Sequence, residues 1–293
     1  MSGDYDKSTT FGGKVSKINS QPGSNSARKP ETSLSIRQKK QNGEKIVMTT
    51  CYDSTFATLV SRAAVDMVLV GDSAGNVMMG YEDTLEVTLD DMCFFARSVA
   101  RKLHGPFLVV DMPFLSYQIS NEQALESAKK LVQKGRAQAV KLEGGAEVCE
   151  RMKAIVSAGV PVVGHLGFTP QSIHALGGYK VQGRGEEASQ LLLEDAKAIE
   201  LAGAMALVLE MVPEKIASEI SKTLSIPVIG IGAGVGCDGQ VLVLQDILGM
   251  DPGFKPKFVK HYTNLSETVV GALNEFSAEV KASEFPSTEH GFQ

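Results

Sequence analysis

Residues 107–145 read FLVVDMPFLSYQISNEQALESAKKLVQKGRAQAVKLEGG, and this stretch contains two short apolar runs separated by a helical pattern. The runs are residues 107–110 and 139–142, and both are continuously apolar apart from Lys141. Continuous rather than alternating apolar character is typical of parallel strands, which are buried on both faces. Residues 121–134 between them predict a helix. The stretch therefore predicts one strand-helix-strand unit of a parallel sheet.

The same alternation continues on both sides of this stretch. Further apolar runs occupy residues 46–48, 67–70, 160–163, 206–209 and 228–231, and helical patterns occur at residues 186–202 and 213–224. An eighth strand at residues 241–244 is ambiguous, because residues 240–248 also fit a helix. Seven or eight units without a dinucleotide-binding fingerprint favour a closed (β/α)8 TIM barrel over a doubly wound sheet.

The chain divides by composition into a tail and one domain. Residues 1–33 are rich in Ser, Gly, Lys and Asn and predict a disordered N-terminal tail, because they bury too little apolar surface to offset the entropy of ordering. Residues 34–293 predict a single barrel domain. Beyond Phe258 we expect a helical appendage, with residues 265–284 as its main segment.

Composition excludes several classes of protein. The net charge of −5 and the lack of a basic stripe argue against a nucleic-acid partner. No apolar run approaches the ~18 residues of a membrane span, and the N-terminus lacks the apolar core of a secretory signal. The four cysteines form no CxxC pair, so neither a zinc site nor a redox motif is indicated. We expect a cytoplasmic protein in a reducing environment.

Polar or ionisable residues follow or end five consecutive predicted strands. These residues are Asp72 and Ser73 after the second strand, Asp111 after the third, Lys141 and Glu143 in and after the fourth, His165 at the end of the fifth and Glu210 after the sixth. Barrel enzymes assemble their active sites at this C-terminal face. A polar strand end that simply meets solvent explains any one of these residues equally well. It explains all five positions together much less well, because their side chains should converge on one axial cavity.

The residue types at these strand ends indicate a metal. Lys141 and Glu143 are two apart in one strand and should face the same side. Asp72, Asp111 and Glu143 would repel one another unless they are protonated or neutralised by a cation. Their hard oxygens suit Mg²⁺, and the alternatives are that all three bind it directly or that one acts through a coordinated water. Zinc fits less well, because no cysteine or second histidine accompanies them.

Two glycine-rich segments are less specific. Residues 230–234 (GIGAG) follow a strand and resemble a phosphate-binding loop, but close packing at the barrel rim explains the glycines about as well. Residues 177–185 (GGYKVQGRG) form a polar loop that suits a lid or a substrate-binding segment, with a plain connector as the alternative.

Seven motifs in register resemble the ketopantoate hydroxymethyltransferase family. They are LVGDS at 69–73, VDMPF at 110–114, KLEGG at 141–145, GHLGFTPQS at 164–172, GGYKVQGRG at 177–185, LVLEMVP at 207–213 and IGIGAG at 229–234. The resemblance runs from about Ser33 to the chain end. Two small departures are Glu86, where many relatives have Pro, and Met112, where Leu is common.

This resemblance implies a (β/α)8 barrel of the phosphoenolpyruvate/pyruvate-domain type and a complete reaction. The reaction is transfer of a hydroxymethyl group from 5,10-methylenetetrahydrofolate to 3-methyl-2-oxobutanoate, giving 2-dehydropantoate through a magnesium-stabilised enolate in pantothenate and coenzyme A biosynthesis. The resemblance also implies a homodecamer. It places the metal ligands on Asp72, Asp111 and Glu143, the ketoacid contacts on Asp72, Ser73, Asp111 and Lys141, and the proton acceptor on Glu210.

The chemistry of the residues agrees with this reaction. A 2-ketoacid chelated on Mg²⁺ loses its C3 proton more easily. A base such as Glu210 must take that proton. Lys141 would pair with the negative charge of the substrate. His165 is a further candidate ligand of the keto oxygen or a proton shuttle, and a structural role is as compatible with the sequence. Two alternatives remain: a lyase or mutase of the same barrel group, and a binding barrel without activity.

Overall fold

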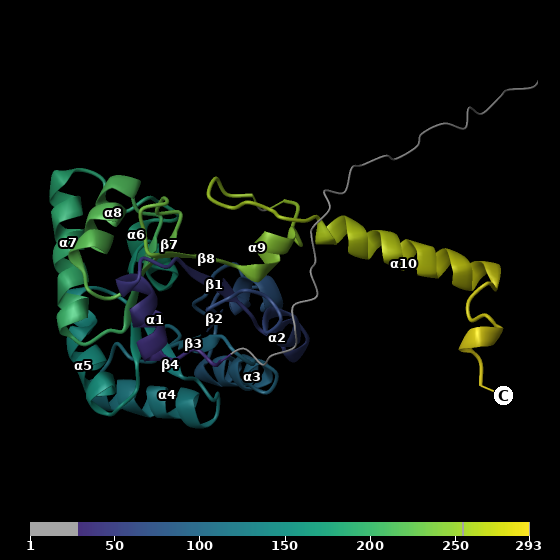
Figure 1. Ribbon diagram of the computed structural model, residues 1–293, viewed down its shortest axis with the longest axis horizontal. Helices are drawn as coiled ribbons and strands as arrows, with labels where there is room; N and C mark the ends of the chain where they lie inside the picture. Colours follow the sequence, from purple (N-terminus) through teal and green to yellow (C-terminus); the bar gives the residue numbers. More distant parts are fainter. Residues whose placement is uncertain (1–28, 254, 293) are drawn as a thin grey trace, which may run out of the picture.

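Eight parallel strands form a closed barrel in the computed structural model, which describes residues 29–253 and 255–292. Each strand pairs with the next in the chain, and β8 pairs with β1 to close the ring (Figure 1). The strands are β1 Ile46–Thr50, β2 Met67–Val70, β3 Phe107–Asp111, β4 Ala139–Glu143, β5 Val162–Gly167, β6 Ala206–Glu210, β7 Val228–Ile231 and β8 Gly239–Leu242. The predicted barrel is confirmed.

Helices surround the strands and cover their outer faces (Figure 1). The covering helices are α2 Ser54–Val60, α3 Leu89–Ala100, α4 Asn121–Gln133, α5 Cys149–Ser157, α7 Glu186–Leu201 and α8 Glu214–Thr223. Shorter segments are a π-helix at Gly75–Met79, 3₁₀ turns at Ala146–Val148, Pro170–Ser172 and Thr288–His290, and helices α6 Ile173–Leu176 and α9 Leu244–Leu248. Residues 232–238 join β7 directly to β8.

The barrel interior has its own apolar core, separate from the layer between strands and helices. It is filled by Met67, Phe107, Val163 and similar side chains from successive strands. Helix α1 (Ser33–Gln41), capped by Thr32, contributes Ile36, which is fully buried in this interior core. The middle of the interior is therefore packed with apolar side chains. The buried strand-end residues Asp111, Lys141, Glu143 and His165 lie where the strands finish, and Asp66, paired with Lys39, lies where they begin.

Two predicted strand boundaries were wrong. The fifth strand begins at Val162 rather than at residue 160, because Pro161 lacks the N–H that a ladder needs, and it runs on to Gly167. The predicted end of this strand at residues 164–167, which include His165, is confirmed. At the eighth strand both expected patterns exist in succession, since β8 ends at Leu242 and α9 begins at Leu244.

The two ends of the chain differ in how they meet the barrel. Residues 1–28, most of the predicted tail, lie outside the described residues, while Glu31 N already donates to Gly105 O at 2.7 Å. The appendage contains α10 (Leu265–Ala282), which extends away from the barrel and has no buried residue (Figure 1). In the described part of the chain, no helix combines the length and apolar character that crossing a membrane requires.

Candidate active site

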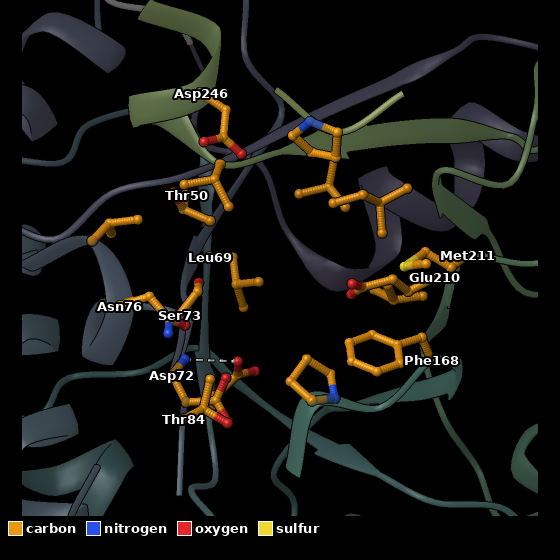
Figure 2. A pocket seen from close by; sticks show the side chains of 18 of the residues that line it. Thr50, Leu69, Asp72, Ser73, Asn76, Thr84, Phe168, Glu210, Met211 and Asp246 are labelled. Carbon is orange, nitrogen blue, oxygen red and sulfur yellow. Dashed lines mark hydrogen bonds between the residues drawn. The ribbon is translucent and has the colours of Figure 1, made fainter. Parts of the chain in front are cut away.

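A single cavity of about 810 Å³ at the C-terminal end of the barrel is lined by every residue that the strand-end pattern selected (Figure 2). These residues are Asp72, Ser73, Asp111, Lys141, Glu143, His165 and Glu210. The predicted convergence is therefore present in the structure. Five of the seven side chains belong to residues that are at most 5% exposed, namely Asp72, Asp111, Lys141, Glu143 and His165.

Strand register brings these side chains together. Asp111 on β3 pairs with Lys141 on β4, and Glu143 on β4 pairs with His165 on β5. Side chains on paired positions of neighbouring strands stand beside each other on one face of a sheet. Gly167 on β5 pairs with Glu210 on β6 at a φ of 92°, and a side chain there would collide with the Glu210 carbonyl oxygen. Glycine at this position allows the two strand ends to approach.

The buried groups form one continuous ionic network. Lys141 Nζ lies 3.0 Å from Asp111 Oδ1 and 3.8 Å from Glu143 Oε1. His165 Nδ1 lies 3.0 Å from Glu143 Oε1, and its Nε2 lies 3.4 Å from Glu210 Oε2. The histidine thus connects the buried carboxylates to the carboxylate at the cavity wall. The sequence left the role of His165 open, and the structure places this residue in contact with Glu210.

Burial and neighbouring charge shift the acidities within this network. Burial, together with repulsion from Asp111 and Glu143, raises the pKa of Asp72 well above its usual range. Burial also raises the pKa of Asp111, although Lys141 opposes the shift. Burial acts the same way on Glu143, but His165 and Lys141 outweigh it and lower the Glu143 pKa. Asp72 is therefore the carboxylate most easily protonated when no further cation is near.

The histidine and the lysine are held as cations. Burial and the Lys141 ammonium lower the pKa of His165, but Glu143 and Glu210 outweigh them and raise it to about 9. Burial lowers the pKa of Lys141, and Asp111, Glu143 and Asp72 more than compensate and raise it above its usual value. Both groups are therefore positively charged near neutral pH.

Charge balance in the cavity fits a divalent cation. Among the strand-end residues, four carboxylates (Asp72, Asp111, Glu143 and Glu210) face the two cations, which leaves two uncompensated negative charges when all are ionised. The same cavity is also lined by Glu82, Asp246 and Asp251. Asp111 Oδ1 is buried and accepts no well-aligned hydrogen bond despite its ion pair with Lys141. No three acidic, histidine or cysteine side chains within residues 29–253 and 255–292 form a complete metal cage. The donors present suit Mg²⁺, which usually completes its shell with water or substrate oxygens.

Gln171 is a central residue that sequence reasoning missed. Its Nε2 donates to Asp72 Oδ2 at 2.8 Å and to Met112 O at 2.9 Å, and its backbone N–H donates to Glu143 Oε2 at 3.0 Å. Tyr117 O–H donates to Gln171 Oε1 at 2.9 Å. Gln171 is 4% exposed and holds two of the carboxylates in place. It lies within the GFTPQS motif, but spacing alone does not show that its side chain turns back into the barrel.

Two hydroxyl groups also belong to the site. Ser73 Oγ and Tyr52 Oη are 2.8 Å apart, which fixes the serine at the cavity wall. Thr84 lines the same cavity, and its buried Oγ1 has no hydrogen-bond partner in the part of the chain that the structure describes. An unpartnered buried hydroxyl in the wall of this cavity, which Figure 2 shows together with Asp72, is a ready contact for water or a ligand.

The two glycine-rich segments have different roles. Tyr179 of the 177–185 segment lines the cavity and stacks on Phe168 with ring centroids 5.0 Å apart, as a substrate-binding segment would require. In the 230–234 segment, a side chain at Gly232 would meet the ring of Phe258, and one at Gly234 would collide with Glu214. Close packing therefore accounts for these glycines, without a phosphate.

Comparison with known sequences gives a family match over most of the chain. The family model described as ketopantoate hydroxymethyltransferase matches residues 31–288. The chain is 52% identical over 262 residues to the 3-methyl-2-oxobutanoate hydroxymethyltransferase of Enterococcus faecalis, covering 89% of this chain and 95% of that protein. It is also 52% identical over 265 residues to the protein of the same name from Syntrophus aciditrophicus, covering 90% and 97%.

Comparison with solved structures gives the fold group. Phosphonopyruvate hydrolase in complex with oxalate and Mg²⁺ superposes with a TM-score of 0.58 at 14% identity, covering 89% of this chain and 93% of that one. A 2,3-dimethylmalate lyase, a member of the PEP mutase/isocitrate lyase superfamily, superposes with a TM-score of 0.56 at 14% identity, covering 90% and 89%. The chain therefore shares the barrel fold of these proteins.

Proposed function

Since the chain belongs to the ketopantoate hydroxymethyltransferase family, we propose that it forms 2-dehydropantoate from 3-methyl-2-oxobutanoate with 5,10-methylenetetrahydrofolate as the one-carbon donor. The product would enter pantothenate and coenzyme A biosynthesis. The observation that carries this proposal is Glu210, which lines the cavity beside His165 and the buried carboxylates. A base is thus available next to a site that suits a small anionic ketoacid.

Asp72 and Asp111 are the residues that we assign to Mg²⁺ directly. Both oxygens of Glu143 already accept hydrogen bonds from His165 and Gln171, so Glu143 would contact the ion through water. When bound, Mg²⁺ would withdraw electron density from the carboxylate and keto oxygens of the ketoacid. The presence of oxalate and Mg²⁺ in phosphonopyruvate hydrolase, which shares the fold, supports this assignment.

Lys141, Ser73 and His165 bind and orient the substrate in this proposal. The ammonium of Lys141 pairs with the ketoacid carboxylate or with charge that develops on its oxygen. The Ser73 hydroxyl, held by Tyr52, contacts the ketoacid from the opposite wall. His165 Nε2, which is buried and makes no well-aligned hydrogen bond with any described residue, donates to the keto oxygen or to Glu210.

Glu210 removes the C3 proton of the bound ketoacid. The carboxylate takes the proton, and the electron pair of the C–H bond forms an enolate. C3 of the enolate bonds to the one-carbon unit, whose two C–N bonds break and are replaced by this C–C bond and by a hydroxyl group from water. Tetrahydrofolate leaves with its two nitrogens protonated, one by the proton that Glu210 took and one by the second proton of the water. His165 positions the Glu210 carboxylate by the 3.4 Å contact with Oε2. General-base catalysis of this kind is worth about 10²–10⁴-fold in rate.

The first test separates this activity from the lyase or mutase alternative. Purified protein with Mg²⁺, 3-methyl-2-oxobutanoate and 5,10-methylenetetrahydrofolate should yield 2-dehydropantoate, measured by mass spectrometry. Oxaloacetate and isocitrate should remain unconsumed. Cleavage of either acid without hydroxymethyl transfer would overturn the proposal. A barrel without activity would also show no rise in Tm with Mg²⁺ plus ketoacid, whereas ligand binding stabilises a folded protein.

The second test addresses the metal. Asp111→Asn should weaken the binding of Mg²⁺ and of the ketoacid together, by about tenfold or more in calorimetric titration, because a charged ligand is lost. Asp90→Asn, at an exposed acidic residue on the outer helix α3, is the matched control and should leave both affinities unchanged. Unchanged binding of both ligands in Asp111→Asn would remove this carboxylate from the metal site.

The proposal extends to assembly and location. The apolar side chains Val270, Leu273 and Phe276 of α10 are more than half exposed, which supports burial of this helix in a homo-oligomer. A decamer is the assembly that we propose, and light scattering of the purified protein tests it. The four cysteines are unpaired, which agrees with a cytoplasmic location.

A further inference from the structure

The cavity has a second polar end, away from the buried carboxylates. Gln245 and Asp246, at the start of α9, line it together, and we call them the rim pair. In Figure 2 Asp246 lies across the cavity from Asp72, and its carboxyl oxygens point inward toward Thr50. Leu69 lies between these two ends, with Ser73 on one side of it and Glu210 on the other (Figure 2). The cavity therefore has two polar ends with an apolar side chain between them.

The strand at the barrel wall fixes the rim pair in place. Thr50 at the end of β1 accepts a hydrogen bond from the backbone N–H of Leu244 at 3.0 Å, which anchors the start of α9. The Gln245 side-chain amide donates only to Met78 Sδ, at 3.6 Å. The backbone of α9 therefore sets the position of the two residues, and their side chains make no strong polar contacts.

The rim pair presents hydrogen-bond acceptors without donors. Gln245 is 7% exposed, and its buried Oε1 has no hydrogen-bond partner among the described residues. No group in the described part of the chain donates a hydrogen bond to the half-buried Asp246 carboxylate, and burial raises the pKa of this carboxyl to about 6. Buried acceptors without donors are unfavourable unless a ligand satisfies them. The rim pair is therefore a site whose acceptor oxygens receive no hydrogen bond from the described residues.

Apolar side chains, one of them aromatic, line the same cavity as these acceptors. Phe258, Pro256 and Met250 follow α9 in the chain and line the same cavity. The ring of Phe258 packs closely against Gly232 at the end of β7, which fixes its position. A cavity of about 810 Å³ is larger than a small branched ketoacid needs and lies in the range of sites for larger ligands. The second ligand should be flat, largely apolar on its faces and rich in donors on one edge.

We infer that the rim pair binds the pteridine ring of the folate donor, with Asp246 accepting hydrogen bonds from the ring N–H and the adjacent amino group. This inference rests on the proposed function, because that function supplies the donor. A pteridine has both donors on one edge, and a carboxylate can accept such a pair in parallel. Its faces suit stacking on aromatic and apolar side chains. The negative charge of Asp246 disfavours an anion at this end, so the ketoacid and the glutamate tail of folate should lie elsewhere.

The binding test uses tetrahydrofolate as the probe. Asp246→Asn should weaken tetrahydrofolate binding about 10- to 100-fold in calorimetric titration, because a charge-assisted pair of hydrogen bonds is lost. Gln245→Met, a second variant at the same site, should weaken it about 3- to 10-fold. The matched control is Asp251→Asn, since Asp251 is an exposed carboxylate at the cavity mouth that already accepts from Gly253 N. The control should change the affinity less than about twofold.

A folate-free reaction separates this inference from the proposed function. Exchange of the C3 proton of 3-methyl-2-oxobutanoate with deuterated water, followed by NMR in the presence of Mg²⁺, requires only the carboxylate end and Glu210. Asp246→Asn should retain this exchange and should have an equal or higher Tm, because partial burial disfavours the charge that is removed.

The possible outcomes lead to different conclusions. Normal folate affinity in Asp246→Asn, or an equal loss in Asp251→Asn, overturns the rim-pair assignment and leaves the proposed function intact. Loss of exchange in Asp246→Asn also overturns it, because Asp246 would then act on the ketoacid end or on the fold. A wild-type protein that neither exchanges the proton nor binds tetrahydrofolate overturns the proposed function itself.

Discussion

The two ends of the barrel interior are equally buried and chemically opposite. At the end where the strands begin, Ile36, Ile46 and Phe107 are at most 4% exposed and belong to one apolar cluster, with the Asp66–Lys39 ion pair beside the strand starts. At the end where the strands finish, Asp111 and Lys141 are at most 3% exposed and are charged. Burial of apolar surface stabilises the fold by roughly 25 cal/mol per Å², whereas burial of a charge destabilises it unless the charge is paired. Stability and chemistry are thus separated along the barrel axis.

The largest effect that would test this separation is on turnover. Glu210→Gln should lower kcat by about 10²–10⁴-fold, because the amide cannot take the C3 proton. Ketoacid binding and Tm should stay near their wild-type values, since Glu210 is only partly buried at the cavity wall. Steady-state kinetics, ketoacid titration and thermal unfolding measure the three quantities. Near-normal turnover would exclude Glu210 as the base.

The next largest effect concerns the buried cation. Lys141→Met leaves Asp111 and Glu143 without their ammonium, and removal of one partner from a buried ion pair costs about 3–5 kcal/mol. The double variant Asp111→Asn with Lys141→Met should recover part of this loss in the free energy of unfolding, measured by urea titration, while activity stays absent. If Lys141→Met alone had the same free energy of unfolding as wild type, the unpaired carboxylates of Asp111 and Glu143 would not destabilise the fold as their burial implies.

The separation also explains what the sequence could predict. Asp72, Asp111, Glu143 and Glu210 were predictable because parallel strands finish at one edge, so residues at successive strand ends must converge. The β5 boundary was misplaced because apolar periodicity does not register the missing N–H of Pro161. Within the strands, the local sequence pattern was enough to predict which residues line the site.

Residues outside the strands could not be placed in the same way. Gln171 and Tyr117 lie on the connections that follow strands, and their side chains reach Asp72 and Glu143 only through the tertiary fold. The sequence gives no periodic signal for such side-chain directions. The same holds for Asp246, because an ambiguous strand or helix at residues 240–248 leaves its orientation open. Supporting residues of the site therefore required the structure.

At the apolar end, a substitution should reduce stability without changing chemistry. Ile36→Ala removes a fully buried side chain from the interior core and should lower the free energy of unfolding by about 2–5 kcal/mol. Leu34→Ala on the same helix is the control, because Leu34 is 76% exposed and should change stability by less than about 0.5 kcal/mol. Both variants should keep wild-type kcat below their unfolding temperatures. A drop in kcat for Ile36→Ala would show that the two ends are coupled.

The smallest expected effect lies at the rim, where Asp246 is charged but only half buried. Its pKa is raised from 3.8 to about 6 by burial, so the folded protein binds more protons than the unfolded chain between these two values. Stability from this group therefore falls as pH rises through that window and is constant above about 6. The Tm difference between wild type and Asp246→Asn should be near zero at about pH 4 and should grow to about 2 °C in favour of the variant by about pH 6.5, as solvent screening limits the size. A difference that does not change with pH would mean that the folded barrel leaves this carboxyl unperturbed. The loss of stability caused by buried charge would then be confined to the buried groups at the strand ends and would not extend to the rim pair.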